Sequence, residues 1–215
     1  MYLSRITLLP HAAQDPAFWA MFREAYATHQ EVWRWAGGGP DAQRDFLYRV
    51  DETDTGLPQV LILGTRPARA PENLWRSESK IWAPRLEVGQ RLGFTLRANA
   101  VVRHGAERHD VVLHAKKLAA AAGQPPGSEA DRTQETGERW LRAQGAKRGF
   151  EAETVIVGGH HVVQMGRGSK AIRLGILDIE GALTVTEPDR FVAALTTGIG
   201  PAKGFGFGLM LVRPI

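Results

Sequence analysis

The stretch Gly198-Ile199-Gly200-Pro201-Ala202-Lys203-Gly204-Phe205-Gly206-Phe207-Gly208 places five glycines and one lysine between an amphipathic helix and an apolar strand. Because glycine permits positive φ and carries no side chain, such a loop can lie closely against phosphates or against another part of the backbone. A nucleotide loop of the Walker type needs Gly-Lys followed by Ser or Thr at the head of a helix, whereas Gly204 leads into Phe205 and a strand. The loop therefore favours close packing over nucleotide binding.

The elements around this loop form an alternating pattern. Glu187-Pro188 opens a helix through Leu195, and Phe205 to Val212 is the closing strand. Upstream lie a strand within 91–102, an insertion with the low-complexity stretch 118–127, a helix over 129–143, strands over 150–157 and 161–165, and an extended run over 170–186. With the insertion set aside, the order is βαββαβ.

The first part of the chain gives the same order. We expect a strand over 1–9, a helix opened by Asp15-Pro16, strands over 46–51 and 59–65 joined by the turn 52–58, a short helix near 71–77 and a strand within 80–88. The pattern predicts an α+β fold of two tandem ferredoxin-like (βαββαβ, RRM-like) domains, residues 1–88 and 89–215. The sequence itself shows no internal repeat, so the duplication rests on element order.

Composition limits the chemistry and the setting. The 215 residues are 43% hydrophobic, contain no cysteine and carry a net charge of +4. Thiol nucleophiles, disulfides and cysteine-based zinc sites are thereby excluded. No apolar run is long enough for a membrane span, and the first residues alternate like a strand instead of forming a signal peptide. We expect a soluble, cytoplasmic protein with no membrane partner.

Five pieces of the chain, taken in order, resemble one known family. They are Met1-Tyr2-Leu3-Ser4-Arg5, Tyr26-Ala27-Thr28-His29, Phe46-Leu47-Tyr48-Arg49, Phe94-Thr95-Leu96-Arg97-Ala98-Asn99, and the carboxy-terminal segments 181–185, 188–191 and 198–209. Together they resemble the CasE branch of the repeat-associated RNA-binding proteins of CRISPR systems. The family often has proline after the Ala-Asn pair, where this chain has Ala100.

The resemblance implies both an activity and partners. It implies a metal-independent endoribonuclease without a cofactor, which cuts the stem-loop repeat of precursor CRISPR RNA. It also implies that the protein stays bound to the product beside other subunits of the type I-E surveillance complex. A noncatalytic RNA-binding subunit of the same fold is the alternative. An enzyme for small molecules with a glycine-rich phosphate loop has less support, because no acidic metal ligands or complete nucleotide motif accompany the loop.

Metal-free RNA cleavage uses the ribose 2′-hydroxyl as nucleophile and needs proton transfer and charge stabilisation. His29 follows Tyr26 by three residues, so both side chains should share one helix face, and histidine suits either proton transfer. The spacing of Tyr26, His29 and Arg34 resembles the family's tyrosine, histidine and basic residue. Arginine stays protonated, so Arg34 is expected to stabilise charge. Tyr26 is equally consistent with a core aromatic residue.

Basic residues gather in the second half of the chain. From Arg139 to Arg173 there are seven basic residues and two acidic ones, which fits either a solvated face or a polyanion site. The segment Gly166-Arg167-Gly168-Ser169-Lys170 has the composition of a hairpin tip. We expect this segment to contact the RNA stem, with basic residues of the preceding helix and its exit on either side. Lys203 is the best phosphate ligand of the glycine loop. The expected RNA-binding residues are Arg139, Arg142, Lys147, Arg148, Arg167, Lys170, Arg173 and Lys203, and the loop glycines are Gly198, Gly200, Gly204, Gly206 and Gly208.

The remaining histidines do not predict a metal site. His104, His109 and His114 repeat every five residues, which matches neither one helical face nor one strand face. His160 and His161 follow two glycines, where we expect a hairpin turn whose adjacent side chains point to opposite sides. Their expected role is in a loop, with RNA contact as the alternative. No metal is therefore expected.

Overall fold

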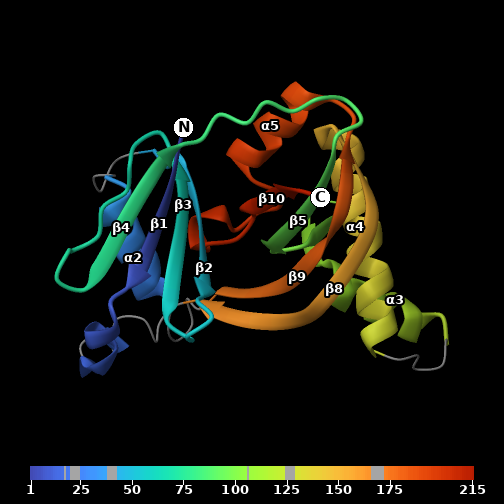
Figure 1. The fold of residues 1–215 in the computed structure, drawn as a ribbon. Coiled ribbons are helices and arrows are strands. Elements are labelled where there is room, and N and C mark those ends of the chain that lie inside the picture. The colour runs from blue at the N-terminus through green and yellow to red at the C-terminus, as the bar shows by residue number, and fades with distance from the viewer. Residues whose placement is uncertain (17, 20–24, 38–42, 106, 124–128, 166–171) are drawn as a thin grey trace.

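The computed structural model describes residues 1–16, 18–19, 25–37, 43–105, 107–123, 129–165 and 172–215. Two four-stranded antiparallel sheets dominate it, one from each half of the chain (Figure 1). The chain crosses from one to the other in the segment between residues 82 and 90. The predicted α+β class is confirmed.

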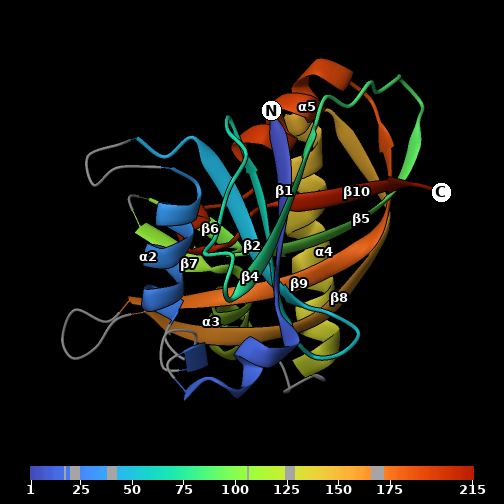
Figure 2. The same ribbon diagram turned by 60° about the vertical axis from the view of Figure 1, so that its left-hand side comes forward.

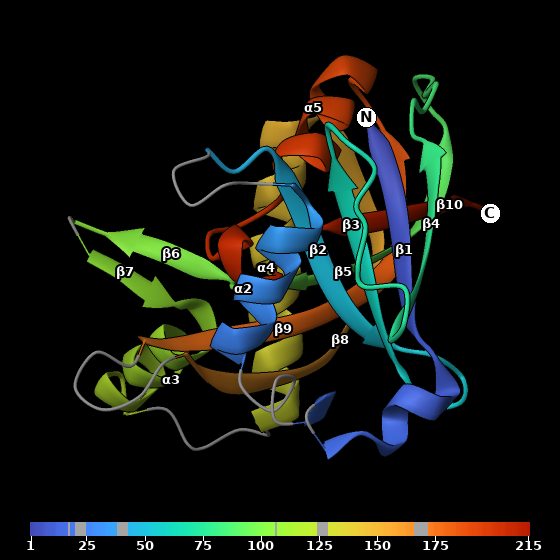
Figure 3. The ribbon, with the colours of Figure 1, turned by 90° about the vertical axis from the view of Figure 1, so that its left-hand side faces the viewer.

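The first half forms the sheet β2-β3-β1-β4. Its elements are β1 (Tyr2–Leu8), η1 (Pro10–Gln14), α2 (Ala25–Trp35), β2 (Phe46–Glu52), β3 (Pro58–Gly64) and β4 (Trp75–Ile81). β1 pairs antiparallel with both β3 and β4, and Figure 3 shows α2 lying beside β2. This strand order is that of a ferredoxin-like sheet.

The short helix expected near 71–77 is wrong, and so is the strand expected within 80–88. Residues 72–74 form a turn, and β4 begins at Trp75 and ends at Ile81. Trp75 is buried against Phe18 and Trp35, while most of the polar residues after it are exposed. An edge strand with one buried anchor and an otherwise polar sequence lacks the alternation by which strands are recognised.

The second half forms the sheet β10-β5-β9-β8, again in ferredoxin-like order. Its elements are β5 (Arg91–Ala98), β6 (Val101–His104), β7 (Glu107–Asp110), α3 (Val111–Ala121), α4 (Glu129–Arg148), β8 (Phe150–Met165), β9 (Ile172–Val185), α5 (Pro188–Thr197), η3 (Lys203–Phe205) and β10 (Met210–Pro214). The hairpin β6–β7 and helix α3 are an insertion between β5 and α4. Figure 3 shows this hairpin projecting away from both sheets.

Three expected elements differ in this half. The strand expected within 91–102 is broken after Ala98, where the buried Asn99 side chain donates to the Gly175 carbonyl. The turn expected at 158–161 is wrong, because β8 runs unbroken and absorbs Gly158 in a bulge. The closing strand begins at residue 210 instead of 205, since Lys203–Phe205 forms a 3₁₀ turn. Figure 2 shows β8 and β9 as a long curved ribbon that reaches α2.

Each sheet has its own hydrophobic core, and the two halves also share a contact. One core is made by buried residues between 6 and 75, and the other by buried residues between 92 and 210. Leu47, Leu63 and Leu209 pack together from both halves. Arg97 adds a polar link by donating to the Val50 carbonyl at 2.8 Å. We propose that the domains divide at residues 88 and 89. No helix among the described residues is long and apolar enough to cross a membrane.

Candidate active site

His29 lies on α2 against the 3₁₀ turn η3, so the two halves of the chain meet at its ring. Its Nδ1 atom is hydrogen-bonded to the backbone carbonyl of Gly204. The imidazole also packs against Phe205, with ring centres 5.2 Å apart, and edge-on against Trp33, with ring centres 5.8 Å apart. The ring is therefore held on three sides.

This hydrogen bond determines the tautomer of His29. A carbonyl oxygen only accepts, so Nδ1 must carry the proton and the neutral ring keeps its free electron pair on Nε2. Burial lowers the pKa of His29, the Gly204 carbonyl raises it and the positive charge of Arg44 lowers it further, with a lowered pKa as the net result. At neutral pH the ring is therefore suited to accept a proton at Nε2.

The glycines of the loop let it pack closely enough to place the Gly204 carbonyl. Gly206 has φ +87°, and a Cβ there would lie 2.8 Å from Tyr48 Cε2. Gly200 has φ +85°, and a Cβ there would lie 2.9 Å from the Asn99 carbonyl oxygen. Side chains at these positions would both strain the backbone and collide with the protein interior. Close packing, one of the two uses considered for the loop, is thus present.

Of the other two expected catalytic residues, Tyr26 lies beside His29 and Arg34 does not. Tyr26 lies on the His29 side of α2, with ring centres 6.0 Å apart, and is 49% exposed. Arg34 forms an ion pair with Glu31, and its side chain is 69% exposed. Among the described contacts, none joins Arg34 to His29. The structure thus brings Tyr26 beside His29 and places Arg34 with a carboxylate of its own helix.

Arg44 is a site residue that sequence reasoning missed. It precedes β2, and burial lowers the pKa of its guanidinium. Its Nη1 atom is buried and has no hydrogen-bond partner within the described part of the chain. The pKa of Lys203 is also lowered, first by burial and then by the charges of Arg44 and Arg148. Several cations are thus held together near His29, which is costly unless an anion joins them.

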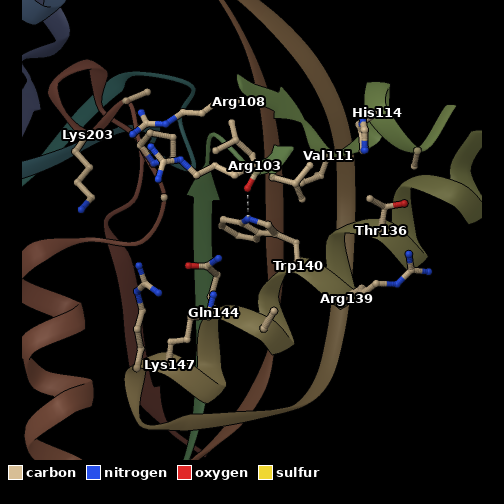
Figure 4. Close-up of a pocket in the computed structure, with 18 of the residues that line it drawn as sticks. Arg103, Arg108, Val111, His114, Thr136, Arg139, Trp140, Gln144, Lys147 and Lys203 are labelled. Atoms are coloured by element: carbon tan, nitrogen blue, oxygen red, sulfur yellow. Dashed lines mark hydrogen bonds between the residues drawn. The ribbon is translucent and has the colours of Figure 1, made fainter. Parts of the chain in front are cut away.

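These cations line a cleft of about 1010 Å³. Seven basic side chains line it and no carboxylate does, counted over the residues that the structure describes: Arg44, Arg103, Arg108, Arg139, Lys147, Arg148 and Lys203. In Figure 4, Lys203, Arg103 and Arg108 lie on one side and Lys147 on the other, with Trp140 between them. Such a charge distribution suits a polyanion.

The expected RNA-binding residues divide into four groups. Arg139, Lys147, Arg148 and Lys203 line this cleft. Arg142 instead pairs with Glu138 and donates to backbone carbonyls of β8, so its charge is used within the fold. Arg173 lies exposed on β9, whereas Arg167 and Lys170 fall outside the described residues.

The histidines gather more closely than their spacing predicts. The hairpin β6–β7 and the helix α3 bring His104 and His109 to His114, at ring-centre distances of 5.8 and 5.2 Å. No group of three His, Asp or Glu side chains suited to a metal occurs in the described ranges. The loop role expected for His160 is wrong, because it lies within β8 with Nε2 3.0 Å from Asp110 Oδ2.

The strand orders and the cleft define a protein of the tandem ferredoxin-like class with a strongly cationic surface. The chain belongs to the family of CRISPR-associated proteins, whose model matches residues 1–214. It is 26% identical over its whole length to the CRISPR system Cascade subunit CasE of Escherichia coli, and all of that protein is covered.

Two further comparisons agree with the family. The CRISPR-associated endoribonuclease Cse3 of Thermus thermophilus is 31% identical over 63% of this chain and 61% of that protein. A solved structure of the CRISPR endoribonuclease Cse3 bound to a 19-nucleotide RNA superposes with a TM-score of 0.77, at 23% identity and with both chains fully covered. The resemblance stated from the sequence is confirmed.

Proposed function

We propose that this protein is a metal-independent endoribonuclease that cuts the stem-loop repeat of precursor CRISPR RNA. We further propose that it stays bound to the mature guide RNA in the cytoplasm as a subunit of a type I-E surveillance complex. Support comes from the family and from two relatives, one named an endoribonuclease and the other a Cascade subunit. The observation that carries the catalytic part is the position of His29: the Gly204 carbonyl holds its Nδ1, which leaves Nε2 unprotonated in the neutral ring, and Lys203 and Arg44 lie nearby.

In the proposed reaction, His29 Nε2 takes the proton of the ribose 2′-hydroxyl. The 2′-oxygen forms a bond to phosphorus, the bond to the leaving 5′-oxygen breaks, and that oxygen takes up a proton from solvent water while His29 later returns its proton to solvent. The products carry a 2′,3′-cyclic phosphate and a 5′-hydroxyl. Lys203 and Arg44 stabilise the extra negative charge on the phosphate, and Arg34 is a further candidate for this role. The exposed hydroxyl of Tyr26 lies on the same side and is a candidate partner of the reacting phosphate.

RNA binding outside the cut site rests on the basic residues named from the sequence. We propose phosphate contacts for Arg139, Arg142, Lys147, Arg148, Arg167, Lys170, Arg173 and Lys203. Arg142 is the weakest of these candidates because its guanidinium already has partners in the fold. Gly204 acts through its backbone carbonyl, which orients the His29 ring. The remaining loop glycines allow the close packing that places this carbonyl.

The decisive experiment uses a labelled stem-loop repeat in excess chelator. We expect cutting without divalent metal, and no cutting when the 2′-hydroxyl of the scissile nucleotide is replaced by hydrogen. Binding of that deoxy RNA should stay close to normal, because only the attacking group is removed. Activity that disappears in chelator and returns with magnesium would refute the metal-free mechanism, and normal cutting of the deoxy RNA would refute internal attack. Binding without any cutting would favour the noncatalytic RNA-binding subunit.

A further inference from the structure

The hairpin β6–β7 places two arginines directly opposite each other. Arg103 and Arg108 are cross-strand partners in the antiparallel register, and both are exposed. Like charges in directly opposed positions destabilise a strand pair, and an isolated two-stranded hairpin is only marginally stable in water. Neither arginine has an ion-pair partner among the described side chains. A bound anion would remove this repulsion.

The cleft beside the hairpin is lined by further positive charges that lack acidic partners among the described lining residues. Arg103 and Arg108 line the cationic cleft, and α4 contributes Lys147 from another side of it (Figure 4). Arg148, the last residue of α4, also lines the cleft. Of the seven cations in this cleft, Arg139 alone has an ion pair within the described ranges, with Glu135. Unpaired positive charges held on separate elements around one cavity indicate a ligand with several negative charges.

The cleft borders the candidate active site through Lys203 and Arg44. Lys203, which lines the cleft, is adjacent in sequence to Gly204, whose carbonyl holds His29. Arg44 also lines the cleft, and its charge acts on the pKa values of both His29 and Lys203. A chain of phosphates that passed His29 would therefore meet Arg44 and Lys203 first and the hairpin arginines further on.

The size of the cleft suits a short length of single-stranded RNA. Its volume of about 1010 Å³ is that of a pocket for a small ligand, and roughly two or three nucleotides of a single strand fit such a space. Single-strand sites combine a basic groove along the backbone with few base-specific contacts. Trp140 lines this groove but is buried and donates its indole N–H to the Val101 carbonyl, so it serves as a wall.

We propose that this cleft is a second RNA subsite, which holds the single-stranded nucleotides adjoining the scissile phosphate through their phosphates. This inference rests on the proposed function for the identity of the RNA. Arg103 and Arg108 are its outer phosphate ligands, Lys147 and Arg148 are its side ligands, and Arg44 and Lys203 join it to the cut site. The subsite adds phosphate contacts to nucleotides outside the stem.

The test compares three RNAs that carry the 2′-deoxy block at the scissile nucleotide. One is the bare stem-loop, one has roughly three extra nucleotides beyond the scissile phosphate, and one has the same extension at the other end of the stem. For the wild-type protein, we expect the extension beyond the scissile phosphate to strengthen binding about tenfold, and the extension at the other end of the stem to leave binding unchanged. The extension beyond the scissile phosphate should also steepen the plot of log affinity against log salt by about 0.7 for each phosphate held.

The double variant Arg103→Gln/Arg108→Gln should lose the affinity that the RNA extension adds, while it binds the bare stem-loop like the wild type. Glutamine keeps much of the side-chain length, and thermal unfolding checks that the fold is intact. Lys147→Gln, which leaves the hairpin unchanged, should reduce the gain by a smaller factor. The matched control Arg76→Gln/Lys80→Gln removes two exposed charges from β4 and should keep the gain in full.

Two results would overturn the subsite. In one, the hairpin variant keeps the gain from the extension; in the other, it weakens binding of the bare stem-loop by the same factor, so that the cleft serves the stem. If the wild type gains affinity from the extension but does not cut unblocked repeat RNA, the subsite stands and the proposed catalysis fails. If it does not bind repeat RNA at all, both fail.

Discussion

The imidazole of His29 is hydrogen-bonded to the backbone carbonyl of Gly204, a residue 175 positions later in the chain. The helix α2 supplies the ring and the turn η3 supplies the acceptor, so the reactive orientation exists only when both halves of the protein are packed together. A main-chain carbonyl cannot be removed by changing a side chain. The tautomer of His29 is thereby protected from most substitutions in the loop.

Replacing His29 with alanine should lower the single-turnover cutting rate by about 10² or more, as expected when a general base is lost. RNA affinity should change much less, because the basic cleft is untouched. Single-turnover kinetics and filter binding of the deoxy repeat separate the two effects. His11→Ala, which alters an exposed histidine of η1, serves as the control. A His29→Ala protein that cuts at the normal rate would exclude this residue from the reaction.

The pH dependence of cutting should reflect the lowered pKa of His29. The neutral ring is the active base, so kcat/KM should rise with pH through an apparent pKa below the ordinary 6.5 and then level off. Arg44→Gln removes a nearby positive charge, which raises the pKa of His29 and moves this limb to higher pH. The measurement is a rate profile at constant ionic strength. A rate that falls over the same range would mean that His29 acts as the acid.

Arg34→Ala should slow cutting by about tenfold, through weaker stabilisation of the charge on the phosphate. Glu31→Gln provides the comparison, because it releases Arg34 from its ion pair without removing the guanidinium. If Arg34 reaches the RNA, the Glu31 variant should cut at least as fast as the wild type. Equal rates for all three proteins would make Arg34 a surface residue of α2.

Two loop glycines should respond differently to the same substitution. Gly206→Ala forces a side chain into a left-handed conformation 2.8 Å from the buried Tyr48 ring, and should lower stability by about 1–3 kcal/mol. Within the described ranges, a Cβ on Gly204 has one neighbour, His29 Cε1 at 3.9 Å, so Gly204→Ala should be nearly neutral. Thermal or urea unfolding measures both. A tolerated Gly206→Ala would show that the loop moves away from β2 easily.

The sequence predicted those elements that are marked by the pattern of their own residues, and it missed those that are defined by contacts with distant segments. Strand β1 and the pair β2–β3 were predicted to within a residue or two because their apolar residues mark them locally. Strand β4 was misread because its identity comes from pairing with β1 and from the burial of one residue, Trp75. The two short strands of the insertion were missed because part of them continued the pattern of β5.

The site was predicted unevenly for the same reason. His29 and Tyr26 were found through a spacing on one helix, which the structure preserves as neighbouring rings. Arg44 carries no such signal, because its importance arises from charges brought near it by distant segments. The opposition of Arg103 and Arg108 depends on the register of a hairpin that was not expected.

Asp110 shows how the insertion is attached. Its carboxylate accepts from the backbone N–H groups of Val112 and Leu113 at the start of α3, and it also meets His160 on β8. A Cβ on Gly175 would lie 1.6 Å from Asp110 Oδ2, so only glycine at that position lets the carboxylate reach the sheet. Asp110 thus ties the start of α3 to the sheet, beside the buried side chains of Val111 and Val112. We expect a relative with another residue at Asp110 or Gly175 to hold this arm differently, and so to present Arg103 and Arg108 differently without changing a single cation.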